Sequence, residues 1–492
     1  MHLATLVEMI ESGLADRVLV GTADRALTGE QLGALARAGG AALAGRRQLV
    51  YAGENHPLLP VALLSAAWAG AAFVPLNYRL DDQQLRDLVA QQDDAVVLAD
   101  ARTAARLSDV GAITLDDWLA TLAGTADVAP ADDDDAVAVV LYTSGTTAAP
   151  KAALLRHRHL MAYLLGTIEY ASAGEDEAVL VAVPPYHVAG VANMLSNLFS
   201  GRRLVYLENF TPEVWLRTAA AEHVTHAMVV PTMLARIVDA IDAGEPAPTT
   251  LRSLSYGGAK TATSVLERAL RALPDTGFVN AYGLTETAST IAVLGPDDHR
   301  DAIASDDPTV RARLGSAGRV LPTVEIEIRA DDGSPVAAGT SGILHLRGEQ
   351  IAGEYATGSL LDDGGWFCTR DLAWIDEEGY LFIEGRADDT IIRGGENIAP
   401  AEIEDVIHDH PAVFDVCVVG IPDEEWGQRI AAAVVLREGS RVEADDLRSF
   451  VRDRLRGSKT PEVVVFCDDL PRTATGKTIR RTVLQQLTTS GG

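Results

Sequence analysis

The stretch LYTSGTTAAPKAALLRH, residues 141–157, gives the strongest local indication of how this chain folds and what it binds. A hydrophobic run typical of a strand leads into a loop of small residues, and Pro150, Lys151 and a predicted helix follow. The loop residues that offer hydroxyl or backbone N–H donors are Thr143, Ser144, Gly145, Thr146 and Thr147. Such donors, with one ammonium nearby, can hold phosphate oxygens. We therefore expect a phosphate-binding loop rather than an ordinary Ser/Thr-rich turn.

Lysine is scarce in this chain, which makes each lysine informative. Only four of the 41 basic residues are lysines, namely Lys151, Lys260, Lys459 and Lys477. An ammonium is a compact point charge whereas a guanidinium is a planar fork, so a retained lysine can mark a site that needs the compact charge. Two of the four, Lys151 and Lys477, lie in Gly/Thr-rich loops. We expect Lys260 to be a solvated side chain.

The composition excludes several classes of protein. Hydrophobic residues make up 47% and charged residues 23% of the chain, which are ordinary globular values. With 41 basic and 70 acidic residues the formal net charge is −29, so binding to nucleic acids or anionic membrane surfaces is not expected. The three cysteines fit neither a disulfide framework nor a CxxC site, and the acidic N-terminus does not resemble an export signal. These features predict a cytoplasmic protein.

One uncharged run, residues 58–76, raises the question of a membrane span. It contains Pro60, Gly70 and Pro75 and is rich in alanine, which makes a poor span. We expect instead a buried helix over residues 60–70, followed by a short strand through Phe73 and Val74.

Helical segments alternate with short apolar runs through most of the chain, which is the α/β pattern. The expected strands cover residues 47–52, 136–142, 178–183, 203–207, 226–230, 253–256 and 277–281. From about Leu314 the pattern changes to strands and turns, which indicates a β-rich subdomain. After Arg386, strands and helices alternate again. We therefore expect a large N-terminal α/β domain over 1–387 that includes the β-rich subdomain, and a small α+β domain over 388–492.

Four further motifs follow the loop: SYGGAK (255–260), NAYGLTET (280–287), GWFCTRDLAWIDEEGYLFIEGRADDTIIRGGENIAPAEIE (366–404) and PRTATGKTIRR (471–481). In sequence, order and spacing, these motifs and the loop resemble the adenylate-forming superfamily of acyl-CoA synthetases, luciferases and peptide-synthetase adenylation domains. The resemblance covers most of the chain. It implies a two-domain enzyme with a mobile C-terminal domain that activates a carboxylic acid with Mg·ATP.

Two of these motifs contain side chains suited to a nucleotide. Tyr282 could stack on a purine, and a carboxylate such as Asp371 is a natural acceptor for the two hydroxyls of a ribose. The resemblance implies that Tyr282 packs on adenine and that Asp371 and Arg386 contact the ribose. It also implies that Thr285 contacts the α-phosphate and that Glu286 helps to hold Mg²⁺, for which one protein carboxylate is a normal contribution. The loop expected to line the adenine consists of Gly257, Gly258 and Ala259.

The last motif, PRTATGKTIRR, nearly matches a Walker A loop, but Pro471 occupies the position of a required glycine. The resemblance implies instead that Lys477, on a loop of the small domain, stabilises the charge that grows as the acyl-adenylate forms. Asp388 matches the hinge of the family. Gly394 and Gly395 match a hairpin past which the pantetheine of coenzyme A reaches the adenylate once the small domain has rotated.

PPYHVAG, residues 184–190, is the candidate acyl-binding stretch. A histidine in an apolar run is usually a core residue, but the resemblance places His187 beside the acyl pocket and the thiol channel. The stretch lacks an acidic residue that could pair with a substrate ammonium, so we expect a non-amino acid. Room for a bulky apolar group is provided by the small residues Ala189, Gly190, Ala192 and Ala259. We expect His157 and His159 on a helix surface.

These inferences predict an AMP-forming acyl-CoA ligase that uses an apolar, bulky carboxylic acid, ATP, Mg²⁺ and coenzyme A. One departure from the family leaves an alternative open, because Ala148 and Ala152 stand where its phosphate loop carries glycine. The enzyme could instead make the thioester from an acyl-adenylate supplied by a partner adenylating enzyme. A further alternative is a non-catalytic acyl-CoA- or nucleotide-binding protein, which would be expected to lose Lys477 or Glu286. The sequence is compatible with a homo-oligomer and does not identify the acid.

Overall fold

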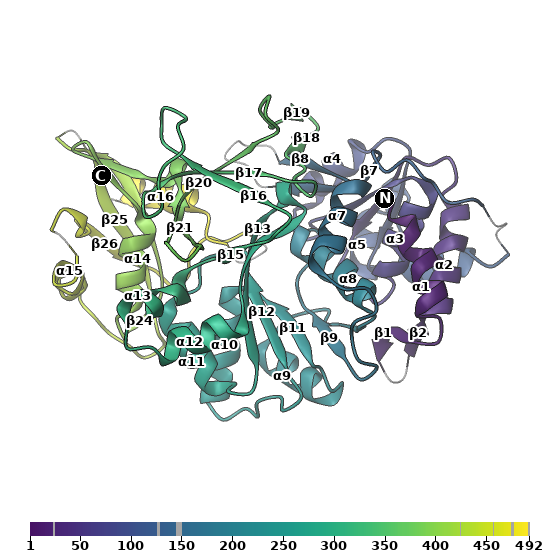
Figure 1. The fold of residues 1–492 in the computed structure, drawn as a ribbon, viewed down its shortest axis with the longest axis horizontal. Coiled ribbons are helices and arrows are strands. Elements are labelled where there is room, and N and C mark those ends of the chain that lie inside the picture. Colours follow the sequence, from purple (N-terminus) through teal and green to yellow (C-terminus); the bar gives the residue numbers. More distant parts are fainter. Residues whose placement is uncertain are drawn as a thin grey trace.

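The computed structural model describes residues 1–22, 25–124, 128–143, 150–423, 425–455, 457–473 and 477–490. Figure 1 shows a large N-terminal part, coloured purple to green, and a small C-terminal part in yellow-green at the left. The N-terminal part contains two large sheets with helices between them and on their outer faces. The predicted fold class, a large α/β domain with a β-rich subdomain and a small α+β domain, is confirmed.

A 13-stranded sheet forms the centre of the N-terminal part. Its mainly parallel half consists of β1 (Val18–Thr22), β2 (Arg25–Thr28), β9 (Ala178–Val181), β10 (Arg203–Tyr206), β11 (His226–Val229), β12 (Ser253–Gly257) and β13 (Gly277–Leu284). Its antiparallel half consists of β14 (Ser289–Leu294), β15 (Gly318–Val320), β16 (Glu325–Arg329), β17 (Gly342–Arg347), β20 (Phe367–Ile375) and β21 (Tyr380–Arg386). β14 and β15 lie between β13 and β21 in this sheet, and a hydrogen bond from Tyr282 to Asp371 joins the end of β13 to β20.

The second sheet has eight strands. In spatial order they are β19 (Gly358–Ser359), β18 (Glu354–Tyr355), β8 (Lys151–Arg156), β7 (Val137–Thr143), β4 (Ala72–Leu76), β3 (Gln48–Ala52), β5 (Ala95–Ala99) and β6 (Ile113–Thr114). Strands β4, β3, β5 and β6 are parallel and almost wholly apolar, as expected for strands covered on both faces. The antiparallel β18 and β19 attach a segment from the β-rich region to this sheet.

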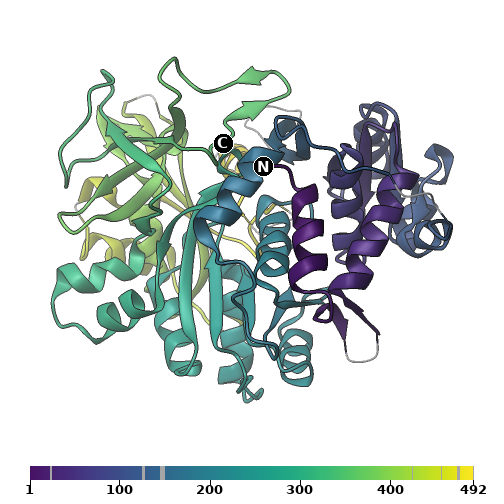
Figure 2. The same ribbon diagram turned by 45° about the vertical axis from the view of Figure 1, so that its right-hand side comes forward.

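The helices of the N-terminal part form three layers around the two sheets. Between the sheets lie α1 (Ala4–Gly13), α2 (Gly29–Ala42), α3 (Leu59–Ala69), α6 (Leu115–Thr121), α7 (His157–Thr167) and α8 (Val188–Ser200). The outer face of the large sheet carries α9 (Pro212–Ala221), α10 (Pro231–Asp242), α11 (Thr263–Ala272) and α12 (Pro296–Ala304), which α13 (Pro308–Ala312) follows. The outer face of the second sheet carries α4 (Asp82–Ala90) and α5 (Ala101–Arg106). Figure 2 shows the purple N-terminal helices beside the blue-teal α7 and α8.

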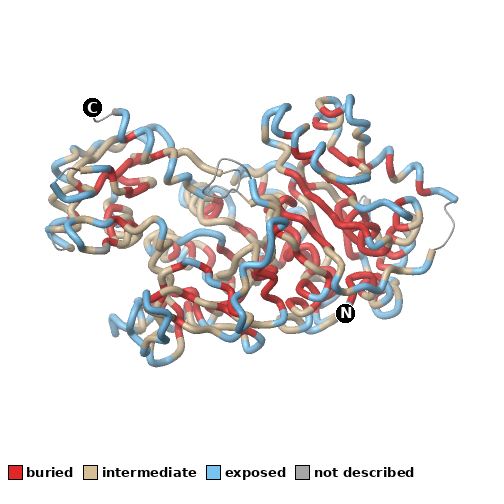
Figure 3. Tube along the Cα trace, turned by 90° about the horizontal axis from the view of Figure 1, so that it is seen from above, coloured by how far each residue is buried: buried red, intermediate tan, exposed pale blue. Residues whose placement is uncertain are grey.

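The C-terminal part has its own sheet and its own core. It consists of the hairpin β22 (Ile391–Arg393) and β23 (Glu396–Ile398), the sheet of β24 (Val413–Asp423), β25 (Gly427–Leu436) and β26 (Val463–Phe466), and the helices α14 (Pro400–His408), α15 (Ala444–Arg452) and α16 (Arg480–Ser490). Alternate residues of β24 face opposite sides: Val418 packs with α14 and α15, whereas Cys417 packs with α16. Figure 3 shows this smaller buried core at the left, apart from the extended buried strands of the N-terminal part.

The strands predicted from the sequence are present, with ends that differ by at most three residues. The uncharged run at residues 58–76 forms α3 and β4, as predicted, and within the described ranges no helix is long and apolar enough to cross a membrane. One prediction was wrong: a strand, β8, rather than a helix follows Lys151. Alternate residues of β8, Ala153 and Leu155, are buried, so pairing with β7 places them in the core and overrides their helical propensity.

Candidate active site

Tyr282, Asp371 and Arg386 meet at one point of the large sheet. Asp371 and Arg386 are register partners in β20 and β21, and Arg386 Nη1 lies 3.3 Å from Asp371 Oδ1. The Tyr282 hydroxyl donates a hydrogen bond of 2.5 Å to the other carboxylate oxygen, Oδ2. Asp371 is only 4% exposed. The structure therefore brings together the three residues predicted to hold adenine and ribose.

The electrostatics of Asp371 show which charges surround it. Burial raises the pKa of its carboxyl group, whereas the Tyr282 hydrogen bond and the positive charges of Arg386 and Lys477 lower that pKa. The negative charge of Glu286 acts in the opposite direction and raises it. Lys477, from the C-terminal part, thus lies within electrostatic reach of the same carboxylate as Glu286, from the N-terminal part.

The phosphate loop is the connection of a β-hairpin. Thr143 and Lys151 are register partners in β7 and β8, and the Thr143 hydroxyl donates a hydrogen bond of 3.3 Å to the carbonyl oxygen of Lys151. Ala152 pairs with Tyr142 in the extended conformation of a strand, which alanine adopts without strain. Four of the predicted phosphate-binding residues lie outside the described ranges: Ser144, Gly145, Thr146 and Thr147. Ala148 also lies outside them.

Thr285 and Glu286 form a short 3₁₀ turn, Thr285–Thr287, directly after β13. Glu286 Oε1 accepts a hydrogen bond from the hydroxyl of Tyr355 in β18, and that hydroxyl lies 3.5 Å from the Oγ1 of Thr143. No sequence pattern marks Tyr355, because its partner lies far away along the chain and β18 has only two residues. The contact joins the predicted metal-binding carboxylate to the first residue of the phosphate loop.

The predicted adenine-lining loop follows β12, next to the end of β13. A Cβ atom on Gly257 would come 2.2 Å from the carbonyl oxygen of Ala281, and Gly258 has φ +84°, so both positions require glycine. Ala259 is exposed. Lys260 is exposed to solvent, as predicted, and its ammonium also lies 2.5 Å from the carboxylate of Asp405 in α14. This ion pair joins the loop to the C-terminal part.

His187 precedes α8, and its ring packs against Tyr186 with 4.6 Å between the ring centroids. Burial, and to a lesser extent the charge of Arg79, lower the pKa of His187 to about 4, so its imidazole is neutral near pH 7. Its Nε2 and the Tyr186 hydroxyl are buried and have no hydrogen-bond partner among the described residues. Such atoms are usually satisfied by a ligand or water.

Two other histidines differ from their prediction. His157 and His159 are 0% and 3% exposed rather than on a helix surface. They face the core because α7 lies between the two sheets, a position that the charged residues flanking them in the sequence do not reveal. Burial lowers the pKa of His157 to about 3 and that of His159 to about 4.

The predicted hinge and hairpin lie at the start of the C-terminal part. Asp388 belongs to a 3₁₀ turn, Ala387–Asp389, that follows β21. Gly394 and Gly395, between β22 and β23, are exposed and have φ of +57° and +83°. A Cβ atom on Gly394 would come 2.8 Å from the ring of Trp426, whose side chain is also exposed. The hairpin therefore faces solvent, whereas the charge of Lys477 acts on Asp371.

A polar cavity of about 880 Å³ lies at the carboxyl ends of β3 and β5. These strands form a topological switch point, because β4 and β5 pair with opposite edges of β3, and ligands of α/β proteins often bind at such points. Among the residues that line the cavity are Tyr51, Tyr78, Arg79, Asp100, Arg102 and Arg106. Arg79 also acts on the pKa of His187, so the cavity adjoins the candidate acyl site. Its lining comes from several loops, which is why no single sequence motif marks it.

This fold and site define an α/β protein with a large and a small part, in which Tyr282, Asp371 and Arg386 form a group suited to a nucleotide. The family described as AMP-binding enzyme matches residues 12–356, and its C-terminal domain matches residues 402–477. The chain belongs to the AMP-binding enzyme family.

Several characterised proteins resemble the whole chain. A feruloyl-CoA synthase from an Amycolatopsis species is 34% identical, with 90% of each chain covered. The indoleacetate–CoA ligase of Aromatoleum aromaticum is 33% identical, with 93% of this chain and 91% of the relative covered. The o-succinylbenzoate CoA synthetase of Bacillus subtilis, solved with its acyl-adenylate intermediate, has a TM-score of 0.84, 25% identity and 97% coverage of both chains. The resemblance inferred from the motifs is thereby confirmed.

Proposed function

We propose that this chain is an AMP-forming acid–thiol ligase that joins an apolar, bulky carboxylic acid to coenzyme A through an acyl-adenylate. The observation that carries the proposal is that Tyr282 and Arg386 meet at the buried carboxylate of Asp371. The charges of Lys477 and Glu286 act on the same carboxylate. Adenylate formation from ATP requires a ribose acceptor, a carboxylate suited to Mg²⁺ and a cation near the α-phosphate. Asp371, Glu286 and Lys477 can supply these groups.

In the first step, a carboxylate oxygen of the acid attacks the α-phosphorus of ATP, and pyrophosphate leaves. We assign the adenine to Tyr282 and the loop Gly257–Ala259, and the ribose to Asp371 and Arg386. We assign the phosphates to Thr285, Thr143, Lys151 and the loop between Thr143 and Lys151. Lys477 stabilises the negative charge that develops around the α-phosphorus, an effect that depends on the charge being positioned in advance.

Glu286 fits a Mg²⁺ ion held jointly with phosphate oxygens. Among the described residues its Oε2 receives no hydrogen bond, and no group of three or more His, Cys, Asp or Glu side chains in those residues is arranged to hold a metal alone. One carboxylate with phosphate and water oxygens is a usual Mg²⁺ coordination. When bound, the ion would neutralise charge on the phosphates.

In the second step, the thiol of coenzyme A attacks the acyl carbon and AMP leaves. We assign the domain boundary to residue 388, between 1–387 and 388–492, with Asp388 as the hinge. Rotation there would withdraw Lys477 and bring Gly394 and Gly395, exposed in this structure, to the adenylate. His187, neutral near pH 7, would lie beside the acyl group and the entering thiol.

The cavity beside His187 is our candidate for the nucleotide end of coenzyme A. It is polar, it lies at a switch point, and Arg79 and Arg102 offer cations for phosphate groups. Changing Arg102 to Ala is then expected to raise the KM for coenzyme A and to leave the KM for ATP unchanged. Equal effects on both constants would contradict this assignment.

An apolar acid is supported by two observations. The stretch Pro184–Gly190 contains no carboxylate to pair with a substrate ammonium, and burying an unpaired ammonium would be costly. In addition, the similar ligases named above act on feruloyl and indoleacetate groups, which are bulky and aromatic. We therefore favour an aryl, alicyclic or aliphatic acid.

The test is a panel of carboxylic acids incubated with ATP and coenzyme A, with products identified by mass spectrometry. We expect AMP and an acyl-CoA from an apolar acid. Turnover of a free α-amino acid in preference to all such acids would overturn the substrate class. The absence of both AMP and thioester with every acid would favour a non-catalytic protein.

Two further aspects are proposals. A cytoplasmic location fits the described cysteines, Cys368, Cys417 and Cys467, all of which are free thiols. A partner that supplies the acyl-adenylate would be needed only if the phosphate loop failed, and Ala152 gives no reason for failure because it lies unstrained in β8.

A further inference from the structure

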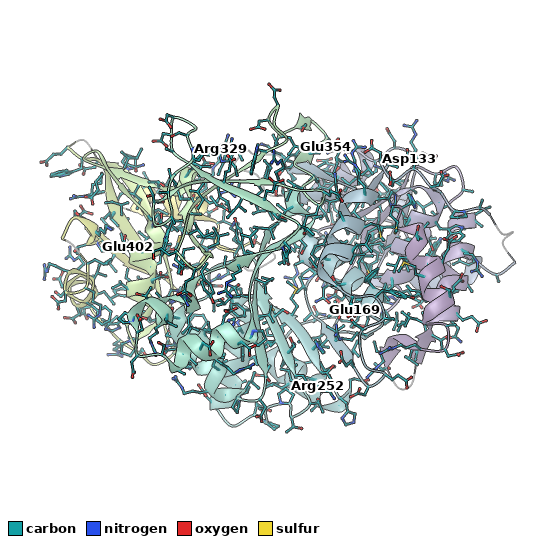
Figure 4. The ribbon with its side chains drawn as sticks, in the orientation of Figure 1. Asp133, Glu169, Arg252, Arg329, Glu354 and Glu402 are labelled. Carbon is teal, nitrogen blue, oxygen red and sulfur yellow. The ribbon has the colours of Figure 1, made fainter. Side chains whose placement is uncertain are left out.

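The backbone that carries Tyr355 is tied to the strand that leaves the phosphate loop. Tyr355 is the register partner of Ala153 in β8, and the Ala356 N–H donates a hydrogen bond of 2.9 Å to the carbonyl oxygen of Ala152. Next to it, the guanidinium of Arg156 binds both carboxylate oxygens of Glu354 at 2.7 and 2.8 Å. Figure 4 labels Glu354 at the top of the molecule, where Figure 1 labels β18 and β8. Tyr355 is thus fixed relative to β8.

The same segment holds the backbone of Glu286. The N–H groups of Ala352 and Gly353 donate hydrogen bonds of 2.8 and 3.0 Å to the carbonyl oxygen of Glu286. Tyr355 binds the side chain of the same residue. Residues 352–355 therefore determine both where Glu286 lies and where its carboxylate points.

In the hydrogen bond between Tyr355 and Glu286, donor and acceptor can be assigned. An ionised carboxylate only accepts hydrogen bonds, so the phenol is the donor. The bond therefore occupies Glu286 Oε1 without neutralising the carboxylate, and Oε2 receives no hydrogen bond among the described residues.

We propose that Tyr355 is a positioning residue for the ATP-dependent half-reaction: by holding Glu286 Oε1 it leaves Oε2 available to the Mg²⁺ of Mg·ATP and fixes the carboxylate relative to Thr143 and β8. The proposal rests on the function proposed above, in which Glu286 is the protein ligand of that ion. Partners that orient a metal ligand typically contribute about 10- to 100-fold to metal affinity. AMP, which needs no metal, does not use this contact.

The test is calorimetric binding of Mg·ATP and of AMP, in the absence of acid and coenzyme A, to the wild type and to Tyr355→Phe. This change removes only the hydroxyl. We expect the affinity for Mg·ATP to fall about 10- to 100-fold and the affinity for AMP to stay within about twofold. Equal loss of both ligands would assign Tyr355 a structural role and overturn the proposal, as would unchanged binding of both.

Tyr380→Phe is the matched control. The Tyr380 hydroxyl also donates to a carboxylate, at 2.6 Å from Asp298 Oδ1, and Tyr380 is likewise buried, but neither residue belongs to the candidate site. We expect Tyr380→Phe to leave both affinities unchanged. A selective loss of Mg·ATP binding in this control would show that the effect of Tyr355→Phe is not specific to Glu286.

Glu286→Gln separates this proposal from the function on which it rests. If Tyr355 acts through Glu286, the double variant that combines Tyr355→Phe with Glu286→Gln should bind Mg·ATP about as weakly as Glu286→Gln alone, because the two changes are coupled. Additive losses would overturn the role of Tyr355 and keep that of Glu286. Unchanged Mg·ATP binding in Glu286→Gln would instead overturn the assignment of the metal ligand.

Discussion

The guanidinium of Arg370 lies 3.3 Å from the carboxylate of Asp388, so the residue before Asp371 is joined to the turn at the start of the C-terminal part. Arg370 has φ +61°, in the left-handed region that residues other than glycine seldom adopt. The side chains of this pair are 65% and 44% exposed, and an exposed ion pair contributes at most about 1 kcal/mol. The contact can therefore form in one domain orientation and break in another at little cost.

Proline at position 388 should separate the two half-reactions. Proline fixes φ near −65°, so Asp388→Pro would hamper a rotation that changes the backbone angles of residue 388. We expect one half-reaction to be impaired, and the other to survive, when pyrophosphate exchange and thioester formation from synthetic acyl-adenylate are measured separately. Asp388→Ala, which also loses the Arg370 contact but keeps backbone freedom, is the control. Wild-type rates for both steps in Asp388→Pro would exclude this hinge.

Removing Lys477 should affect mainly adenylation. Its charge is needed where the anhydride forms, and loss of one positioned electrostatic group costs about 10²–10³ in rate. We expect Lys477→Ala to lose acyl-adenylate formation by that factor and to retain thioester formation from synthetic acyl-adenylate. Lys477→Arg keeps the charge in a planar group and tests whether the compact ammonium is required. Equal losses in the two assays would contradict the assigned role.

The sequence predicted those parts of the site that depend on local pattern. Tyr282, Thr285 and Glu286 stand at a strand end and the turn that follows it, and their motif identified them. The strands that build the large sheet were predicted because their apolar runs are short and are bounded by turn residues. The motif and the apolar runs each extend over only a few consecutive residues, so a single sequence is enough to recognise them.

Features that depend on tertiary pairing could not be predicted in this way. Tyr355 reaches Glu286 only because β18 pairs with β8, and Lys260 pairs with Asp405 only because the C-terminal part lies against the adenine loop. The strand β8 resembles a helix in sequence, and only its pairing with β7 makes it extended. Contacts between distant segments leave no periodic signal along the chain.

Buried His157 should make the stability of the N-terminal part depend on pH. Its folded pKa is lowered to about 3, whereas in the unfolded chain it titrates near 6.5. Below pH 6.5 the unfolded chain binds a proton that the folded chain excludes, so stability falls as the pH falls toward 3. At about pH 5 the loss from this group is about 2 kcal/mol.

Urea unfolding of the wild type and of His157→Gln, at about pH 7.5 and about pH 5, measures this contribution. Glutamine does not titrate, so we expect the variant to lose less stability on acidification than the wild type. The ring of His2, whose pKa burial also lowers, lies 3.5 Å from that of His157, so the same comparison is made in a His2→Gln background. An equal loss in both proteins would show that His157 does not remain neutral in the folded state.

The two alanines of the phosphate loop should differ in their effect on adenylation. Ala152 is extended in β8 and paired with Tyr142, so Ala152→Gly adds only flexibility, which costs about 0.5–1 kcal/mol within a strand, and should not raise the rate. Any loss from the missing glycines would therefore come from Ala148.

Wild-type enzyme with its acid should show rapid pyrophosphate exchange, measured beside coenzyme A consumption from synthetic acyl-adenylate. The opposite result would be coenzyme A consumption without exchange, with exchange restored by Ala148→Gly alone. The wild-type enzyme would then depend on a supplied adenylate. Restoration by Ala152→Gly alone would contradict the strand conformation on which this separation of the two positions rests.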